Sequence, residues 1–431
     1  MKKSWLGPQL ILEKKRQYLL PCLYHFYRDP PQFVRGQGCY MYDSKGREYL
    51  DFYAGVSVHA LGHCHPELVE TIREQVGTLQ HTTSIYLNES IVKLAETLAG
   101  FYPWQEIHRS FFCASGSEAV EGACLLATLH TGRSEIIALQ NGLHGRTKLG
   151  MSLTGLSFWR TDPNPVGGIV HVPTPFCYRC AYGRAPRDCN LLCAAEVEKI
   201  IATATCGKIA AFIAEPVQGN GGIVVPEERY FSAVYPIIKK AGGLFIVDET
   251  QTGFGRTGRK FGIEHYGVRP DIICGGKALG GGTPVGYFST TDEIAESFQR
   301  PGASTFGGNP VTAEAGCKLL EILVRDGLVQ AAAEKGAFLG SALGQLRGKF
   351  PRRAGDVRGK GLMWGVELVD AEGHPDAGLT DNVLERLKDC GLLLGRTGPG
   401  RNVLTFMPPL IVTEEQIRHA VELVSDALEE L

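Results

Sequence analysis

A single lysine stands in a glycine-rich segment of the sequence. Lys277 follows the short apolar run 272–274 and is flanked by Gly275, Gly276 and Gly280. Glycines let the backbone approach a ligand closely, and a lysine held out of water loses its proton more readily because desolvation lowers its pKa. Lys277 is therefore a candidate reactive amine. Taken alone, the same residues would also fit a surface lysine in a flexible loop.

A carboxylate ends an earlier apolar run. Asp248 follows residues 244–247, and open α/β sheets bind their ligands at the carboxyl ends of such strands. A buried carboxylate stays ionised only beside a cationic partner, and a protonated pyridine nitrogen is one such partner. Asp248 is thus a candidate ligand of a cationic ring, although it could also cap the turn that follows.

Two segments of small and hydroxyl-bearing residues precede predicted helices. Residues 113–119 pass from an apolar run through Gly116 and Ser117 into a helix, whose free N–H groups and dipole suit a phosphate. Residues 304–310 place Thr305 beside two glycines and a helix start. Each segment is weak evidence alone, because Ser117 could be an ordinary N-cap and the second segment an ordinary loop.

The elements that position these residues alternate along the chain. A hairpin is predicted at 36–52 with its turn at 43–46, followed by helices at 66–77 and 89–98. Short apolar strands separated by helices then predict a largely parallel sheet that is covered on both faces. The predicted strands are 110–114, 136–139, 210–214, 244–247 and 272–274.

The pattern of predicted helices and strands changes after Pro310. Long helices are predicted at 311–324 and 329–350, and strands near 361–368 and 402–407. Residues 413–416 have the form of a capping box, which opens a closing helix to about residue 428. We therefore expect three parts. They are an N-terminal segment 1–65 that contributes to a small domain, a large domain 66–315, and a small α+β domain 316–431.

Composition excludes several classes of protein. The chain has 431 residues, 44% of them apolar, and a formal net charge of −2, which gives no general attraction to nucleic acid or to anionic membranes. No apolar run approaches the roughly 18 residues of a membrane span, and charges at 13–16 interrupt the N-terminal run. Thirteen cysteines, an odd number, favour thiols in a reducing compartment. A cytoplasmic protein with no nucleic-acid or membrane partner is expected.

Together, in this order and spacing, the four motifs closely resemble the class III aminotransferases, a fold-type I family that uses pyridoxal 5′-phosphate. The likeness covers nearly the whole chain and includes segments 141–147, 214–216, 248–258, 305–310 and 355–363. Within the family the chain is most similar to the alanine–glyoxylate aminotransferase 2 and phospholyase branch. That closer likeness lies in residues 62–66, 116–119 and 401–403.

The resemblance implies an α/β fold, with a mostly parallel mixed sheet between helices and a smaller α+β domain. It also implies that Lys277 holds pyridoxal phosphate as a Schiff base and serves as general base and acid. Asp248 is expected to pair with the ring nitrogen, which keeps the ring an electron sink. Gln251 is expected to hydrogen-bond the 3-oxygen of the ring.

The remaining cofactor contacts are also implied by the resemblance. Gly116 and Ser117 should hold the phosphate, helped by Thr305 from the other subunit. Leu143 and His144 should lie beside the ring. The role of Thr305 implies an obligate homodimer with shared active sites.

Several positions depart from the family pattern. Leu143 stands where an aromatic residue usually stacks on the ring. Asn220 and Thr405 stand where ornithine and 4-aminobutyrate aminotransferases carry a glutamate and a carboxylate-binding arginine. Without that guanidinium fork, pyruvate or glyoxylate is the expected acceptor rather than 2-oxoglutarate. Arg396 and Arg401 could contact an anionic group instead, or stay solvated.

Four cysteines lie close together in the sequence, in a predicted insertion at about 175–195. Cys177, Cys180, Cys189 and Cys193 fall within seventeen residues. Such spacing fits a structural zinc or iron–sulfur site, and it equally fits free thiols in a surface insertion. The sequence leaves both readings open.

The expected function is an aminotransferase that moves an amino group from an amino acid or amine to a small 2-oxo acid. A lyase of the same family, which eliminates phosphate or ammonia from an amino-alcohol phosphate or aminophosphonate, is the alternative. A third possibility is a non-catalytic, metal-binding regulatory protein on the same fold. The presence of Lys277, Asp248 and Gln251 together argues against it.

Overall fold

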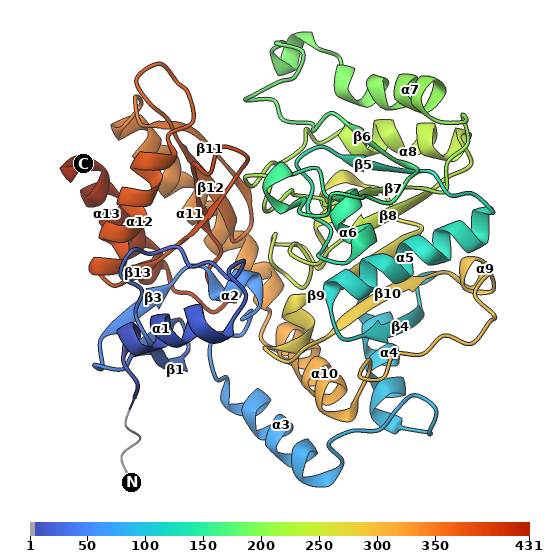
Figure 1. Cartoon of the computed structure of the whole chain (residues 1–431), viewed down its shortest axis with the longest axis horizontal. Helices are drawn as coiled ribbons and strands as arrows, with labels where there is room; N and C mark the ends of the chain where they lie inside the picture. The colour runs from blue at the N-terminus through green and yellow to red at the C-terminus, as the bar shows by residue number, and fades with distance from the viewer. Residues whose placement is uncertain (1–4) are drawn as a thin grey trace.

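Three β-sheets organise the chain into two lobes (Figure 1). The computed structural model describes residues 5–431, apart from the side chain of Pro186, so the first four residues of the predicted segment 1–65 lie outside the described part. A seven-stranded sheet, of order β4-β10-β9-β8-β7-β5-β6, occupies the right-hand lobe. Two four-stranded sheets, β1-β2-β3-β13 and β11-β12-β15-β14, occupy the left-hand lobe.

The seven-stranded sheet is mixed. Strands β6, β5, β7, β8 and β9 are parallel, whereas β10 runs antiparallel to both β9 and β4. This confirms the predicted, mostly parallel mixed sheet and adds β10, a strand that was not predicted, between β4 and β9. Its strands are β4 (Arg109–Cys113), β5 (Ile136–Leu139), β6 (Ile169–Val172), β7 (Ala211–Ala214), β8 (Leu244–Asp248), β9 (Ile272–Gly276) and β10 (Gly286–Thr290).

Helices cover both faces of this sheet because its central strands are apolar on both sides. In β5, Ile137 and Leu139 join the core on one face while Ile136 and Ala138 join the core on the other. Helix α5 packs on β8, β9 and β10, and α8 packs on β8. The helices of this part are α3 (Pro66–Thr78), α4 (Glu89–Phe101), α5 (Gly116–Thr131), α6 (Lys148–Leu153), α7 (Leu192–Ala204), α8 (Tyr230–Lys240), α9 (Asp292–Ala295) and α10 (Pro310–Arg325).

The N-terminal and C-terminal parts of the chain share one sheet. The predicted hairpin is confirmed, with β2 antiparallel to β3 and the turn held by Asp43, whose carboxylate accepts from the backbone N–H groups of Lys45 and Arg47. Strand β3 also pairs in parallel with β13. The strands are β1 (Phe33–Gln37), β2 (Tyr40–Asp43), β3 (Glu48–Asp51) and β13 (Leu392–Leu393).

The third sheet is antiparallel and packs against helices of the C-terminal part of the chain. Its strands are β11 (Ala354–Lys360), β12 (Met363–Leu368), β14 (Gly395–Thr397) and β15 (Val403–Phe406). The predicted strands correspond to β12 and β15, whereas β11 was not predicted. The other helices are α1 (Pro8–Tyr18), α2 (Ala54–Ser57), α11 (Leu328–Lys349), α12 (Ala377–Asp389) and α13 (Glu414–Glu430). The predicted capping box of Thr413 and Gln416 is confirmed.

Blue N-terminal and red C-terminal segments lie together in the left-hand lobe of Figure 1, and segments from cyan to yellow form the right-hand lobe. The parallel contact between β3 and β13 supports an N-terminal segment that contributes to the small domain. We keep the division into 1–65, 66–315 and 316–431 as a proposal.

Candidate active site

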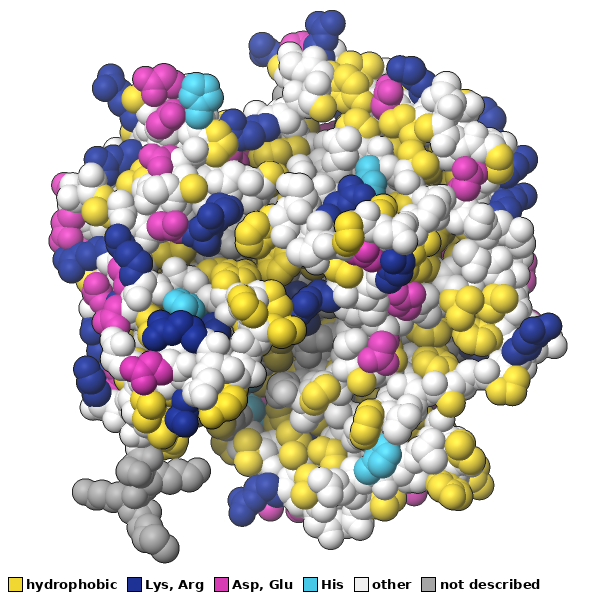
Figure 2. Space-filling view, viewed as in Figure 1, with side chains coloured by type: hydrophobic (Ala, Val, Ile, Leu, Met, Phe, Trp, Pro, Cys, Tyr) yellow, Lys and Arg dark blue, Asp and Glu magenta, His cyan; other side chains and the backbone are white. Residues whose placement is uncertain are grey.

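A cavity of about 250 Å³ lies at the carboxyl ends of the strands in the large sheet. Loops after β4, β5, β7, β8 and β9 line it, which is where an open α/β sheet places its ligands. Figure 2 shows the surface hollowed at the centre of the view, where Figure 1 labels β9. The lining residues are Ser115, Gly116, Ser117, Val120, Leu143, His144, Gly145, Arg146, Glu215, Asn220, Asp248, Thr250, Gln251 and Lys277.

Lys277 is the first residue after β9 and lines this cavity. Its backbone has a φ of 44°, in the left-handed region that residues with a Cβ seldom adopt. Burial lowers the pKa of its ammonium below the ordinary value, although the carboxylates of Asp248 and Glu215 oppose that shift. An amine whose charged form is disfavoured by burial therefore lies close to two carboxyl groups.

Gly276 brings the end of β9 against the start of α5. A Cβ at Gly276 would lie 2.7 Å from the carbonyl oxygen of Val285 and 3.5 Å from the backbone nitrogen of Gly116. Any side chain at position 276 would thus collide with the neighbouring strand. The glycine before Lys277 is a packing requirement of the site.

Asp248 is held by two groups at the end of β8. Its Oδ2 accepts a hydrogen bond from Nδ1 of His144 at 2.9 Å, and its Oδ1 accepts from the backbone N–H of Thr250 at 3.0 Å. Asp248 and His144 are 3% and 1% exposed. The bond to Thr250 shows that Asp248 also caps the turn, as the sequence allowed.

The charges of this pair support each other. Burial alone would raise the pKa of Asp248, but the hydrogen bond and charge of His144, with the bonds from Thr250, bring it below the ordinary value. Burial alone would lower the pKa of His144, but the hydrogen bond and charge of Asp248 raise it above the ordinary value. His144 therefore helps to keep Asp248 ionised.

The N-terminus of α5 opens onto the cavity. Ser115 is the N-cap, since its side chain accepts from the backbone N–H of Glu118, so an N-cap role for Ser117 is wrong. Ser117 instead accepts from the backbone N–H of Arg146 at 3.0 Å. The first N–H groups of a helix have no partner within it, and Gly116 and Ser117 supply them at the cavity wall.

The loop after β5 is held close to this helix. A Cβ at Gly145, whose φ is 119°, would lie 2.6 Å from Oγ of Ser117. Glycine is therefore needed where the two loops meet. Leu143 and His144, which precede it, line the cavity beside Asp248.

Glu215 is a site residue to which sequence reasoning gave no role. Its carboxylate accepts from the backbone N–H of Leu143 at 2.9 Å and from that of Gly219 at 3.0 Å. Burial raises its pKa to about 7, although His144 opposes the shift. The signal was available, because Glu215 follows the apolar strand β7 as Asp248 ends β8.

Gln251 packs tightly against the loop after β7. Its Nε2 lies 3.3 Å from the sulfur of Met407, and a Cβ at Gly219 would lie 1.6 Å from its Oε1. Gly219 therefore makes room for the Gln251 amide at the cavity.

Three positions that sequence reasoning considered do not line this cavity. Thr405 is buried in β15, where its Oγ1 lies 2.9 Å from that of Thr397. Arg396 pairs with Asp381 of α12, and Arg401 lies 3.7 Å from the same carboxylate. Both arginines thus already face an anion.

Thr305 also lies outside the cavity of its own chain. It is exposed, next to Ser304, whose Oγ accepts from the backbone N–H of Gly307. The expected contact from a second subunit stays a proposal.

The four clustered cysteines line a second cavity, of about 20 Å³. They precede β7 in the sequence, whereas the lysine loop follows β9. Burial raises the pKa of Cys193 to about 11, and nearby Cys177 and Cys189 add to the shift. Within residues 5–431, side chain 186 aside, no three His, Cys, Asp or Glu side chains are arranged to hold a metal ion. In the same part of the chain, no helix has both the length and the apolar character that a membrane crossing needs.

The donor set fits pyridoxal 5′-phosphate. The N-terminus of α5 suits its phosphate, the ionised Asp248 suits its ring nitrogen, and Lys277 suits its aldehyde. Nε2 of His144 is buried without a hydrogen-bond partner among the described residues, so the pocket has a polar atom still to be satisfied.

Comparisons with known proteins agree with this site. The profile of the family described as Aminotransferase class-III matches residues 28–428. The chain is 40% identical over 423 residues to alanine–glyoxylate aminotransferase 2 homolog 2, mitochondrial, of Arabidopsis thaliana, covering 97% of this chain and 87% of the relative. It is 37% identical over 424 residues to acetylornithine aminotransferase of Caldanaerobacter subterraneus subsp. tengcongensis, covering 97% and 98%.

A solved structure has the same fold over the same length. A phospholyase from Arthrobacter in complex with phosphoethanolamine superposes with a TM-score of 0.90 at 30% identity, covering 98% of this chain and all of that one. The geometry of the cavity, the family profile and the full-length relatives therefore agree. The chain belongs to the class III aminotransferases and is a pyridoxal-phosphate-dependent enzyme of fold type I.

Proposed function

We propose that the enzyme transfers an amino group from an amino acid or amine to a small 2-oxo acid, pyruvate or glyoxylate, in two half-reactions. The observation that carries this proposal is the convergence of Lys277, Asp248 and the N-terminus of α5 on one cavity. When bound there, pyridoxal phosphate supplies a carbonyl for the amino donor and an electron-accepting ring.

Each residue of the site then has a role of its own. Gly116 and Ser117 hold the phosphate through their backbone N–H groups. Asp248 pairs with the ring nitrogen and stays ionised because His144 donates to it. The Lys277 amine, whose pKa is lowered by burial, removes the proton from the substrate α-carbon and returns it at the acceptor carbon.

Other residues keep these groups in place. Glu215 fixes the backbone of Leu143, whose side chain gives the ring an apolar neighbour. Gln251, held against Gly219, is positioned to hydrogen-bond the 3-oxygen of the ring. None of these three contacts requires the aromatic residue that the family usually carries at position 143.

The acceptor preference follows from the lack of a second carboxylate fork. Thr405 is buried and bonded within its sheet, and Arg396 and Arg401 face Asp381. A dicarboxylic acceptor would then lack the guanidinium that relatives carry at the position of Thr405, where this chain has a hydroxyl. Pyruvate and glyoxylate carry a single carboxylate and avoid this need.

A homodimer with shared sites is part of the proposal. Thr305 is exposed beside Phe306, which is 60% exposed and in ring contact with His81. The nearby run 85–87 is also apolar and highly exposed, with Leu87 fully so. A second copy seated on these residues would bury them and carry its Thr305 to the neighbouring phosphate site. We place the dimer in the cytoplasm, where its many thiols stay reduced.

Elimination is the second candidate, because the similar Arthrobacter structure is a phospholyase that holds phosphoethanolamine. Lys277 would serve either reaction as a base, so the products decide between them. Transamination and elimination differ in whether the cofactor itself takes up the amino group.

Incubation of the purified holoenzyme with amino donors alone tests the proposal. The long-wavelength absorbance of the cofactor should be lost stoichiometrically with an amino acid or amine and return on addition of pyruvate or glyoxylate. Release of an aldehyde, ammonia and phosphate from an amino-alcohol phosphate, with many turnovers and no 2-oxo acid, would establish the lyase instead. Turnover by Lys277→Ala would refute both.

A further inference from the structure

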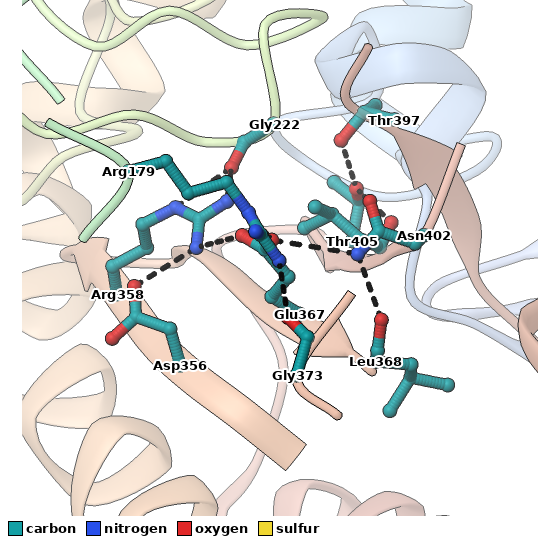
Figure 3. A network of polar contacts seen from close by, with 11 residues as sticks. Arg179, Gly222, Asp356, Arg358, Glu367, Leu368, Gly373, Thr397, Asn402 and Thr405 are labelled. Atoms are coloured by element: carbon teal, nitrogen blue, oxygen red, sulfur yellow. Dashed lines mark hydrogen bonds and ion pairs between the residues drawn. The ribbon is translucent and has the colours of Figure 1, made fainter. Parts of the chain in front are cut away.

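Glu367 of β12 binds two arginines that come from distant parts of the chain. Its Oε2 lies 2.8 Å from Nη1 of Arg358 on β11, and its Oε1 lies 2.5 Å from Nε of Arg179 (Figure 3). The Glu367 side chain is only 3% exposed. Both guanidinium groups thus compensate this carboxylate for the loss of water around it.

Arg179 belongs to the cysteine-rich insertion. It stands between Cys177 and Cys180 and also donates to the carbonyl oxygen of Gly373 at 3.3 Å. The insertion makes further contacts with β11, because the Phe176 ring lies 4.5 Å from the guanidinium of Arg358. The insertion is thus attached to the sheet of β11 and β12, although its neighbours in the sequence, β6 and β7, belong to the seven-stranded sheet.

Arg358 extends the connection to the loop of residues 219–222, which follows β7. Its Nε and Nη2 both donate to the carbonyl oxygen of Gly222, at 2.9 and 2.6 Å. The same loop is held a second time, since the backbone N–H of Gly398 donates to the carbonyl oxygen of Asn220 at 3.0 Å. Asn220 lines the cofactor cavity.

The opposite side of this loop is fixed by the site itself. The backbone N–H of Gly219 donates to Glu215, and Gly219 lies against Gln251. Residues 219–222 are therefore held between the cofactor pocket and Arg358. A shift of the Arg358 guanidinium would move the loop and, with it, Asn220.

The charge balance explains why Arg179 matters to Arg358. Nη1 of Arg358 is shared by Glu367 and by Asp356, whose Oδ2 lies 2.9 Å away. With Arg179 present, two guanidinium groups face two carboxylates. Without it, Arg358 faces two carboxylates alone and is drawn away from Gly222.

We propose that Arg179 is a positioning residue of the aminotransferase. It ties the cysteine-bearing insertion to Glu367 and, through Arg358, fixes residues 219–222, of which Asn220 lines the cofactor cavity. The insertion thereby tunes substrate affinity without touching the cofactor. The activity readout below rests on the proposed function.

Three variants of the full-length holoenzyme test this role. Arg179→Gln removes the charge, Arg179→Lys retains it, and Arg184→Gln is the control, an arginine of the same insertion with no ion pair in the described structure. We expect Arg179→Gln to raise KM for the amino donor about tenfold while kcat changes about twofold or less. Arg179→Lys should recover part of the affinity, and Arg184→Gln should match the native enzyme.

A second readout does not depend on activity. Amide hydrogen exchange at residues 219–222 of the cofactor-free protein should be faster in Arg179→Gln than in Arg184→Gln. The thiols of residues 177–193 should also react faster with an aromatic disulfide reagent, because the insertion is no longer fastened. If Arg179→Gln is insoluble, Arg179→Lys should show intermediate exchange.

Two results would overturn the inference. One is native exchange and native KM in Arg179→Gln. The other is a parallel loss of kcat and bound cofactor, which would mean general unfolding. Failure of the proposed function would be recognised separately, by turnover in Lys277→Ala, and would leave the exchange experiment intact.

Discussion

Nδ1 of His144 lies 2.9 Å from Oδ2 of Asp248, and both side chains are almost completely buried. The two residues are separated by more than a hundred positions in the sequence; His144 follows β5 of the large sheet, and Asp248 is the last residue of β8. The pair therefore joins two loops at the carboxyl edge of the sheet. Its charge state sets the charge at this edge of the cavity.

Replacement of His144 should weaken catalysis without removing the lysine. In His144→Gln, Asp248 loses its charged donor, so its pKa should rise and its pairing with the ring nitrogen should weaken. We expect kcat to fall about tenfold or more. Steady-state kinetics checks this, with Arg160→Gln, an exposed residue that does not line the cavity, as a control for folding. Native kcat in His144→Gln would contradict the role.

The same pair should give the cofactor-free protein a pH-dependent stability. The pKa of His144 is raised, so its contribution is complete below the ordinary histidine value and is lost as pH rises through the raised one. We expect His144→Gln to lose about 2 kcal/mol of unfolding free energy near pH 6 and less near pH 9. Urea unfolding at both pH values measures the difference. An equal loss at the two would argue against a charged His144.

Gly219 offers a test of how Gln251 is held. A Cβ at this position would overlap the Gln251 amide, so Gly219→Ala should displace that side chain from the cavity. Loss of the contact to the 3-oxygen should shift the absorbance maximum of the bound cofactor and weaken cofactor retention about tenfold. Spectral titration checks both. Gly348→Ala, at a helix position where a Cβ meets nothing, is the matched control.

Subunit mixing tests the shared site. Lys277→Ala and Thr305→Glu should each be inactive as homodimers, the latter because it sets a carboxylate against the phosphate. Co-expressed, they should form mixed dimers with one native site, giving about a quarter of native activity by random pairing. Lys277→Ala with Asp248→Ala should give none, since both residues belong to one subunit's cavity. No recovery in the first mixture would sink the placement of Thr305.

Much of the fold was predictable because its strands are short apolar runs. The runs that became β5, β7, β8 and β9 are buried on both faces, so hydrophobicity marks them directly. Strand β10 was missed because two polar residues, Ser289 and Thr290, follow its aromatic residues. Their buried hydroxyls are satisfied by hydrogen bonds to Tyr102 and to the carbonyl oxygen of Asp271. Tertiary hydrogen bonds of that kind leave no periodic signal.

The site was predictable where residue type and strand end coincide. Lys277, Asp248, Gln251, Gly116, Ser117, Leu143 and His144 all line the cavity, as the sequence suggested. Glu215 carried the same signal, since it follows β7, but the bond between His144 and Asp248 could not be predicted, because it depends on the order of strands in the sheet. No local pattern encodes that β5 and β8 both flank β7.

The sheet that joins β3 to β13 has a consequence for synthesis on the ribosome. Strands β1 to β3 emerge well before the strand that completes their sheet, which lies more than 300 residues later, at 392–393. The large lobe can be completed before that point, whereas the first three strands must wait with one edge unpaired. The early chain is therefore the part most in need of protection by a chaperone while the rest is made.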